Sequence, residues 1–194
     1  MTVSNVWQVL YWGWVASEVY VAVRTRTRRG SGKVTDRGSM LILWVVIFAS
    51  MTASQWIEAA GRGPIFGAAI FGAAHWLRVL SLCLMLCGLA IRWTAILTLG
   101  RSFSANVAIQ KEQKVHREGL YRFVRHPSYS GLLLIFLSVG VHTRNWAALA
   151  IAVVPPLAAL MYRIHVEEAA LNEAFGAEYA EYTRETKRLV PGIY

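Results

Sequence analysis

Five apolar blocks, separated by polar connections, limit what this chain can fold into more than any other feature of the sequence. A helix of about 20 mainly apolar residues is long enough to cross a bilayer. Only 16% of the 194 residues are charged, whereas soluble domains carry about 25%. The sequence therefore predicts an all-α, polytopic integral membrane protein with five spans, the fourth of them short. The expected spans are Val6–Val23, Met40–Ile57, Ala73–Leu99, Tyr129–Val141 and Trp146–Arg163.

The basic residues predict how these spans are oriented. Six Lys or Arg residues lie in connection 24–37, six in 101–125 and four in 163–188. The connections between them hold few, chiefly Arg62 and Arg144. Because cytoplasmic connections carry the positive excess, we expect an external N-terminus and a cytoplasmic C-terminus. The membrane would be the cell membrane of a prokaryote or the endoplasmic reticulum of a eukaryote.

The net charge of +9 has the same explanation, so a nucleic-acid partner is not expected. We expect one structural unit with two regions. Residues 1–100 would hold three spans and a basic cytoplasmic loop. Residues 101–194 would hold a polar connection, an apolar helical hairpin and an amphipathic extension of the last span over Glu167–Thr186, together forming the catalytic region.

Some polar and sulfur-containing side chains lie inside the apolar blocks. Arg92 is deep in the third block, where a guanidinium is costly unless it reaches the interface or finds a partner. Glu18, in the first block, is predicted to be a satisfied polar group rather than a catalytic one. Cys83 and Cys87 are one helical turn apart and could form a disulfide only with distortion. We expect them to be buried packing thiols.

One stretch, from Gln110 to Gly131, is polar, aromatic and rich in turn residues at once. Its centre, Arg125-His126-Pro127-Ser128-Tyr129, precedes an apolar run. Pro127 has no N–H and pushes His126 away from helical angles. Ser128 is predicted to cap a helix that begins at Tyr129. The positive end of that helix would favour a polar ligand at the membrane surface.

Arg163 and Glu167 lie four residues apart and therefore face the same way on a helix. One interpretation is an intrahelical ion pair at the interface. Glu168 adds a second carboxylate at the end of the apolar run, and ionisable groups at membrane depth usually mark a site or a pathway. We favour the functional interpretation.

Several kinds of site have little support in the sequence. His126 has no neighbour at metal-ligand spacing, so a metal is not expected, although His116 and His165 could complete a site from a distance. The sequence has no GxSxG elbow, the motif that would indicate a hydrolase. It also has no glycine-rich phosphate loop, which would indicate a nucleotide site.

Taken together, these motifs resemble one enzyme family. The pattern is similar to that of the isoprenylcysteine carboxyl methyltransferases. It consists of Arg125 to Gly131, followed by Arg163, Glu167-Glu168 and then Phe175-Gly176-x-x-Tyr179-x-x-Tyr182. The likeness covers roughly Leu99 to Pro191. It implies methylation, dependent on S-adenosylmethionine, of the C-terminal carboxylate of a prenylated cysteine, with S-adenosylhomocysteine as product.

The resemblance also implies roles for individual residues. Arg163 would face the substrate carboxylate, and Arg163 and Glu167 would be the catalytic pair. The implied cofactor site is lined by Gln110, Gln113, Lys114, Val115, His116, Tyr121, His126, Pro127, Ser128, Tyr129 and Glu167. The partners would be the lipid bilayer and a lipophilic, prenylcysteine-type substrate.

Other functions remain open at this point. Phospholipid methyltransferases and the C-terminal region of sterol reductases look similar around the Arg125–Gly131 motif. A phospholipid N-methyltransferase acts on an amine, which an adjacent Arg163 would not help. A reductase would need a nicotinamide site, for which the sequence has no signal. A membrane scaffold or carrier, in which the charges only pair, is the non-enzymatic alternative.

Overall fold

The computed structural model describes residues 2–24, 32–34, 38–60, 75–100, 103, 108–110 and 115–194 of the chain. Each predicted apolar block forms one long helix. In chain order the α-helices are α1 (Val3–Arg24), α2 (Ser39–Ala59), α3 (His75–Leu99), α4 (Pro127–Thr143), α5 (Trp146–Phe175) and α6 (Ala177–Glu185). A 3-10 helix, η2 (Gly119–Arg122), precedes α4. The all-α architecture of an integral membrane protein is confirmed.

Three of the helices, α2, α3 and α5, are long and apolar enough to cross a membrane. Helix α4 is apolar but has only 17 residues. The total of five spans stays a prediction. The strands β1 (Gly32–Val34) and β2 (Ala108–Gln110) add a small antiparallel pair in which Gly32 lies opposite Gln110.

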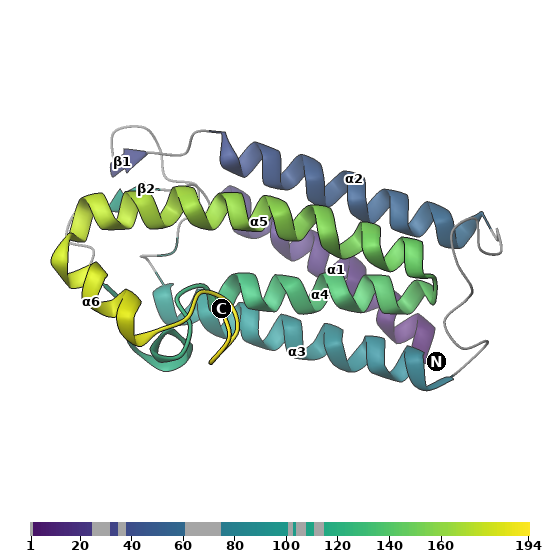
Figure 1. Cartoon of the computed structure of the whole chain (residues 1–194). Coiled ribbons are helices and arrows are strands. Elements are labelled where there is room, and N and C mark those ends of the chain that lie inside the picture. The colour runs from purple at the N-terminus through teal and green to yellow at the C-terminus, as the bar shows by residue number, and fades with distance from the viewer. Residues whose placement is uncertain are drawn as a thin grey trace.

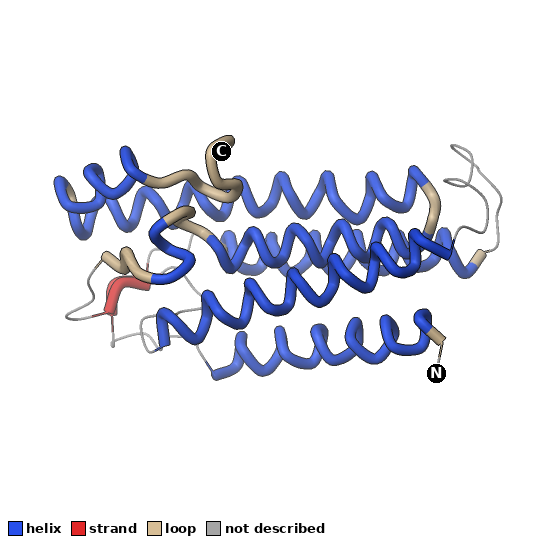
Figure 2. The backbone as a smooth tube through the Cα atoms, turned by 90° about the horizontal axis from the view of Figure 1, so that it is seen from below, coloured by secondary structure: helices blue, strands red, loops and turns tan. Residues whose placement is uncertain are grey.

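The five long helices run side by side as an elongated bundle (Figures 1 and 2). Helix α4 packs against both α3 and α5, α2 lies on α5, and α1 lies on α3. The buried centre contains large side chains from four of these helices. They are Trp7 of α1, Met85 of α3, Ile135 and Phe136 of α4, and Leu160 of α5.

Two glycines allow α3 and α4 to approach closely. A Cβ atom added to Gly88 would lie 2.8 Å from the carbonyl oxygen of Gly131, and one added to Gly131 would lie 2.7 Å from that of Gly88. Small residues at helix interfaces let backbones come together in this way in membranes, where packing drives association. This contact fixes the start of α4, and with it the Arg125–Tyr129 motif, against α3.

Polar elements gather at one end of the bundle. Figure 1 shows β1, β2 and α6 at the end where α3 finishes and α4 begins. The described residues of the three basic connections therefore lie at the same end, as their predicted common side of the membrane requires. Which side of the membrane this end faces stays a prediction.

Three local expectations are wrong. Ser128 does not cap α4, which begins one residue earlier at Pro127, a residue well suited to a first helical position. The polar extension is not continuous, because α5 ends at Phe175 and Gly176, with a φ of 51°, separates it from α6. Cys83 and Cys87 are exposed on α3 rather than buried.

We expect Gly88→Ala to destabilise the protein by about 1–3 kcal/mol, the usual cost of overpacking a core. The new methyl group would lie within 2.8 Å of backbone that cannot move aside cheaply. The matched control is Gly13→Ala on α1, where nothing lies within 4 Å, and alanine should be neutral or favourable. Thermal unfolding in detergent micelles measures both. Equal melting temperatures for the two variants would refute close α3–α4 packing.

Candidate functional site

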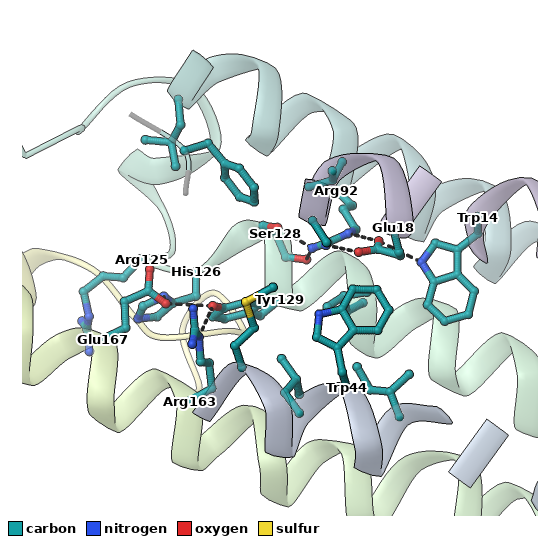
Figure 3. A pocket seen from close by; sticks show the side chains of 18 of the residues that line it. Trp14, Glu18, Trp44, Arg92, Arg125, His126, Ser128, Tyr129, Arg163 and Glu167 are labelled. Carbon is teal, nitrogen blue, oxygen red and sulfur yellow. Dashed lines mark hydrogen bonds and ion pairs between the residues drawn. The ribbon is translucent and has the colours of Figure 1, made fainter. Parts of the chain in front are cut away.

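A cavity of about 300 Å³ opens between the helices near the polar end of the bundle (Figure 3). Its volume is at the lower end of the range typical of small-molecule sites. One part of its wall is polar and comes from the Arg125–Tyr129 motif, the end of α5, α6 and η2. The other part is apolar and comes chiefly from α1 and α2, through residues such as Trp14, Val15, Leu43, Trp44, Ile47 and Met51.

Tyr129 connects the two residues predicted to be catalytic. Its hydroxyl donates to Oε2 of Glu167 at 2.8 Å and accepts from Nε of Arg163 at 3.4 Å. Arg163 is 2% exposed, and its Nη1 donates to the Ser39 hydroxyl at 2.7 Å. The cavity is lined by Arg163, Tyr129 and Glu167. The guanidinium is thus held in a fixed orientation by groups from α2 and α4.

Glu168 has a different position, behind the motif. Its two carboxylate oxygens accept from Nε of Arg125 and from Nε of Arg188, each at 2.9 Å. Nε2 of His126 lies 3.4 Å from the same carboxylate. Glu168 is not among the residues that line the cavity. We infer that it anchors the motif to α5 and is not a reacting group.

The C-terminal residues run alongside the motif, which the sequence did not predict. The backbone N–H groups of Arg125 and His126 donate to the carbonyl oxygens of Lys187 and Arg188 at 2.7 and 3.0 Å. The Ser130 hydroxyl donates to the carbonyl of Leu189 at 2.6 Å. Backbone pairing of this kind carries no pattern in side-chain type, so the sequence had no signal for it.

Three tyrosines complete the polar wall. The Tyr182 hydroxyl donates to the carbonyl of Tyr121 at 2.6 Å, and the Tyr121 hydroxyl to the carbonyl of Ala95 at 3.3 Å. The Tyr179 hydroxyl is buried and has no hydrogen-bond partner among the described residues. Burial raises the pKa of Tyr179 and raises that of Tyr182 to about 12. Tyr179 therefore keeps its proton at neutral pH and offers a hydrogen bond to a ligand.

Arg92 and Glu18 form an ion pair that also lines the cavity (Figure 3). Nε and Nη2 of Arg92 donate to the two oxygens of Glu18, and the Trp14 indole donates to Oε1 of Glu18 at 3.0 Å. The partner that Arg92 requires is therefore on α1. The sequence did indicate that such an ion pair was possible, because two apolar blocks carry opposite charges. It does not show which blocks are neighbours.

Comparison with known proteins identifies proteins that are similar to this chain. Residues 80–173 match the model of the isoprenylcysteine carboxyl methyltransferase (ICMT) family. Protein-S-isoprenylcysteine O-methyltransferase B of Arabidopsis thaliana is 38% identical over 121 residues, which are 61% of each chain. The resemblance to the isoprenylcysteine carboxyl methyltransferase family is confirmed.

Two further similarities extend beyond the residues matched to the ICMT family model. A Xenopus laevis protein-S-isoprenylcysteine O-methyltransferase is 31% identical over 72% of this chain and 49% of its own length. The solved structure of the eukaryotic intramembrane Ras methyltransferase ICMT superposes with a TM-score of 0.61 at 28% identity, covering 77% of this chain and 52% of the other. The chain thus spans less than two thirds of the length of these relatives.

Most of the residues that the ICMT resemblance implies come together at the cavity. Pro127 does not line it but starts α4. The backbone of Gln110 belongs to β2, but the structure does not describe its side chain. Gln113 and Lys114 lie outside the described residues. The implied residues in the wall are Val115, His116, Tyr121, His126, Ser128, Tyr129, Arg163 and Glu167. Their roles in binding a cofactor stay predictions.

The contribution of the first two helices to the cavity was not predicted from the sequence. Both α1 and α2 precede the segment matched to the ICMT model, yet they supply much of the apolar wall and the Ser39 hydroxyl. Tryptophans in an apolar block do not reveal which of them face a cavity. Within the described part of the chain, no group of three His, Cys, Asp or Glu side chains could hold a metal ion.

We expect Glu168→Gln to lower the free energy of unfolding by about 3–5 kcal/mol, because removing one partner of a buried ion pair leaves the other charge uncompensated. The control is Glu181→Gln, whose carboxylate pairs with Arg117 on the surface. Exposed pairs contribute at most about 1 kcal/mol. Unfolding in mixed micelles followed by circular dichroism compares the two, and an equal loss in both would contradict the anchoring role of Glu168.

Proposed function

We propose that this protein methylates the C-terminal carboxylate of a prenylated cysteine, with S-adenosylmethionine as methyl donor, at the cytoplasmic face of its membrane. The observation that carries this proposal is the shape of the cavity. One continuous cavity has two kinds of wall. The buried Arg163 forms the polar wall together with Glu167 and Tyr129, and apolar side chains of α1 and α2 form the other.

The apolar wall suits the lipid part of such a substrate. Its residues on α2 run from Met40 to Thr52, a distance of about 18 Å at about 1.5 Å per residue. A hydrocarbon chain of several isoprene units can lie along this length. Because α1 and α2 belong to the membrane-embedded bundle, a water-insoluble chain could reach the cavity from the bilayer, while polar ligands enter from the end that carries η2 and α6.

Arg163 is suited to orienting the carboxylate that attacks. A guanidinium can hold a carboxylate through two parallel hydrogen bonds. The contacts with Ser39 and Tyr129 restrict its rotation, so that the bound oxygen is presented in a fixed direction. Near-attack geometry of this kind accounts for much of the barrier reduction in reactions that join two molecules. An amine acceptor, as in a phospholipid N-methyltransferase, would gain nothing from this arginine.

The polar wall fits a cationic, nucleoside-containing methyl donor. Carboxylate and tyrosine side chains favour a positive charge, and Glu167 and Tyr129 supply both. The Tyr179 hydroxyl, which bonds to none of the residues that the structure describes, and the His116 side chain are candidate hydrogen-bonding groups for ribose or adenine. When bound, S-adenosylmethionine supplies a methyl group on an electrophilic sulfonium, which a carboxylate can attack without a general base. The residues of this chain then need to bind, orient and exclude water.

The decisive experiment is transfer of a labelled methyl group to a short prenylcysteine analogue, compared with phosphatidylethanolamine as acceptor. We expect the prenylcysteine to be methylated and the phospholipid not. Calorimetric titration of the purified protein with S-adenosylhomocysteine accompanies the assay. Binding without transfer to either acceptor would reject the substrate, and no binding would reject every methyltransferase function.

Arg163→Ala should reduce kcat by about 100-fold, the cost of losing alignment between reacting groups. The affinity for S-adenosylhomocysteine should change little, since Arg163 is assigned to the acceptor. Steady-state kinetics and calorimetry on the same preparation separate the two effects. Arg117→Ala, at the surface of the polar end, is the control and should retain full turnover. Loss of product affinity in Arg163→Ala would contradict the assignment.

Glu167→Ala should have the opposite pattern. Hydrogen bonds to charged groups are worth about 1.5–3 kcal/mol, so we expect the Kd for S-adenosylhomocysteine to rise about tenfold or more. At saturating methyl donor, kcat should fall less than in Arg163→Ala. An unchanged Kd would show that Glu167 serves only to hold Tyr129.

A further inference from the structure

The hydroxyl of Ser128 has an unusual position among the residues of the cavity wall. Ser128 is the second residue of α4 and is 5% exposed. Its oxygen lies 2.7 Å from Nη1 of Arg92, and its backbone carbonyl lies 3.4 Å from the same nitrogen. Figure 3 shows Ser128 between this arginine and the cluster around Tyr129.

The direction of this hydrogen bond follows from the chemistry of arginine. A guanidinium has donors and no acceptor, and it stays protonated in proteins. The Ser128 oxygen must therefore accept, and its own proton must point elsewhere. Apart from Arg92, the described residues make no hydrogen bond with this hydroxyl. A buried hydroxyl proton without an acceptor is costly, unless a ligand in the cavity supplies one.

Arg92 is itself held by Glu18 of α1, which Trp14 holds in turn. Two of its nitrogens bond to Glu18, and the Trp14 indole, another group that can only donate, bonds to Glu18 as well. Each hydrogen bond in this series has one possible donor: Trp14 and Arg92 both donate to Glu18, and Arg92 donates to Ser128. Because Glu18 neutralises Arg92, the arginine orients the serine without adding a free positive charge to the cavity.

We propose that Ser128 is a dedicated hydrogen-bond donor to a ligand carboxylate, and that Arg92 and Glu18 are positioning residues that fix the direction of its proton. This inference rests on the proposed function. A carboxylate is the strongest acceptor in the proposed ligands, and the positive end of the α4 dipole favours an anion at the same place. Two carboxylates are available, that of the methyl donor and that of the prenylcysteine.

Binding of two nucleosides distinguishes these sources. 5′-Methylthioadenosine has the adenine and ribose of S-adenosylhomocysteine but lacks its carboxylate. If the methyl donor is the ligand, Ser128→Ala weakens S-adenosylhomocysteine about tenfold and leaves 5′-methylthioadenosine unchanged. If the acceptor is the ligand, both Kd values stay and the KM for the prenylcysteine analogue rises about tenfold. Ser81→Ala, a buried serine of α3 outside the cavity wall, should alter none of these values.

Equal weakening of both nucleosides, or no change in any Kd or KM, would overturn the role of Ser128. Failure of the unmodified protein to bind S-adenosylhomocysteine would instead reject the proposed function, so the two failures are distinguishable.

The positioning residues are tested by coupling. In a Glu18→Met/Arg92→Met variant, which removes both buried charges together, Ser128→Ala should cost less than half of the fold-change that it costs in the unmodified protein. Arg92→Lys, which keeps a donor-only group opposite Glu18, should retain most of the effect and serves if the double variant does not fold. The full cost of Ser128→Ala in the Glu18→Met/Arg92→Met background, or loss of that cost in Arg92→Lys, would overturn the positioning role.

Discussion

The structure depends on the cost of an unpaired charge inside an apolar bundle. A buried ion without a partner is expensive by several kcal/mol, and two buried carboxylates of the bundle meet opposite charges from other segments of the chain. Glu18 of α1 meets Arg92 of α3, and Glu168 of α5 meets Arg125 and Arg188. These pairs fix the relative positions of α1, α3, α5 and the C-terminal residues. The cavity is the space that remains between helices held in this way.

The same pairing divides the polar residues into two groups. Some, such as Glu168 and Arg125, satisfy one another and hold the fold. Others line the cavity, such as Tyr179, whose hydroxyl has no partner within the described residues, and Arg163, which is anchored to Ser39. This division explains how two adjacent glutamates, Glu167 and Glu168, have different surroundings. On a helix they are about 100° apart, so one faces the cavity and the other faces the Arg125–Tyr129 motif from behind.

The resemblance to the ICMT family and the arrangement of the site overlap but are not the same. The segment matched to the family model covers most of α3, then α4 and most of α5. The helices before it supply Ser39, Glu18 and the apolar wall, and α6 after it supplies Tyr179. Most of the apolar wall is therefore built outside the segment matched to the family model, from residues that need only be apolar and of suitable size.

The sequence by itself determined the helices and their approximate limits, because apolar block length is a local property. The resemblance of its motifs to the ICMT family implied eight residues that do line the cavity: Val115, His116, Tyr121, His126, Ser128, Tyr129, Arg163 and Glu167. Only the tertiary structure decided that Arg92 pairs with Glu18, that Ser39 holds Arg163 and that the C-terminal residues lie along the motif. These contacts join positions 59 to 124 residues apart, and they depend on which segments are neighbours. Helix adjacency is set by close packing, such as that of Gly88 on Gly131, and no pattern within a single helix encodes it.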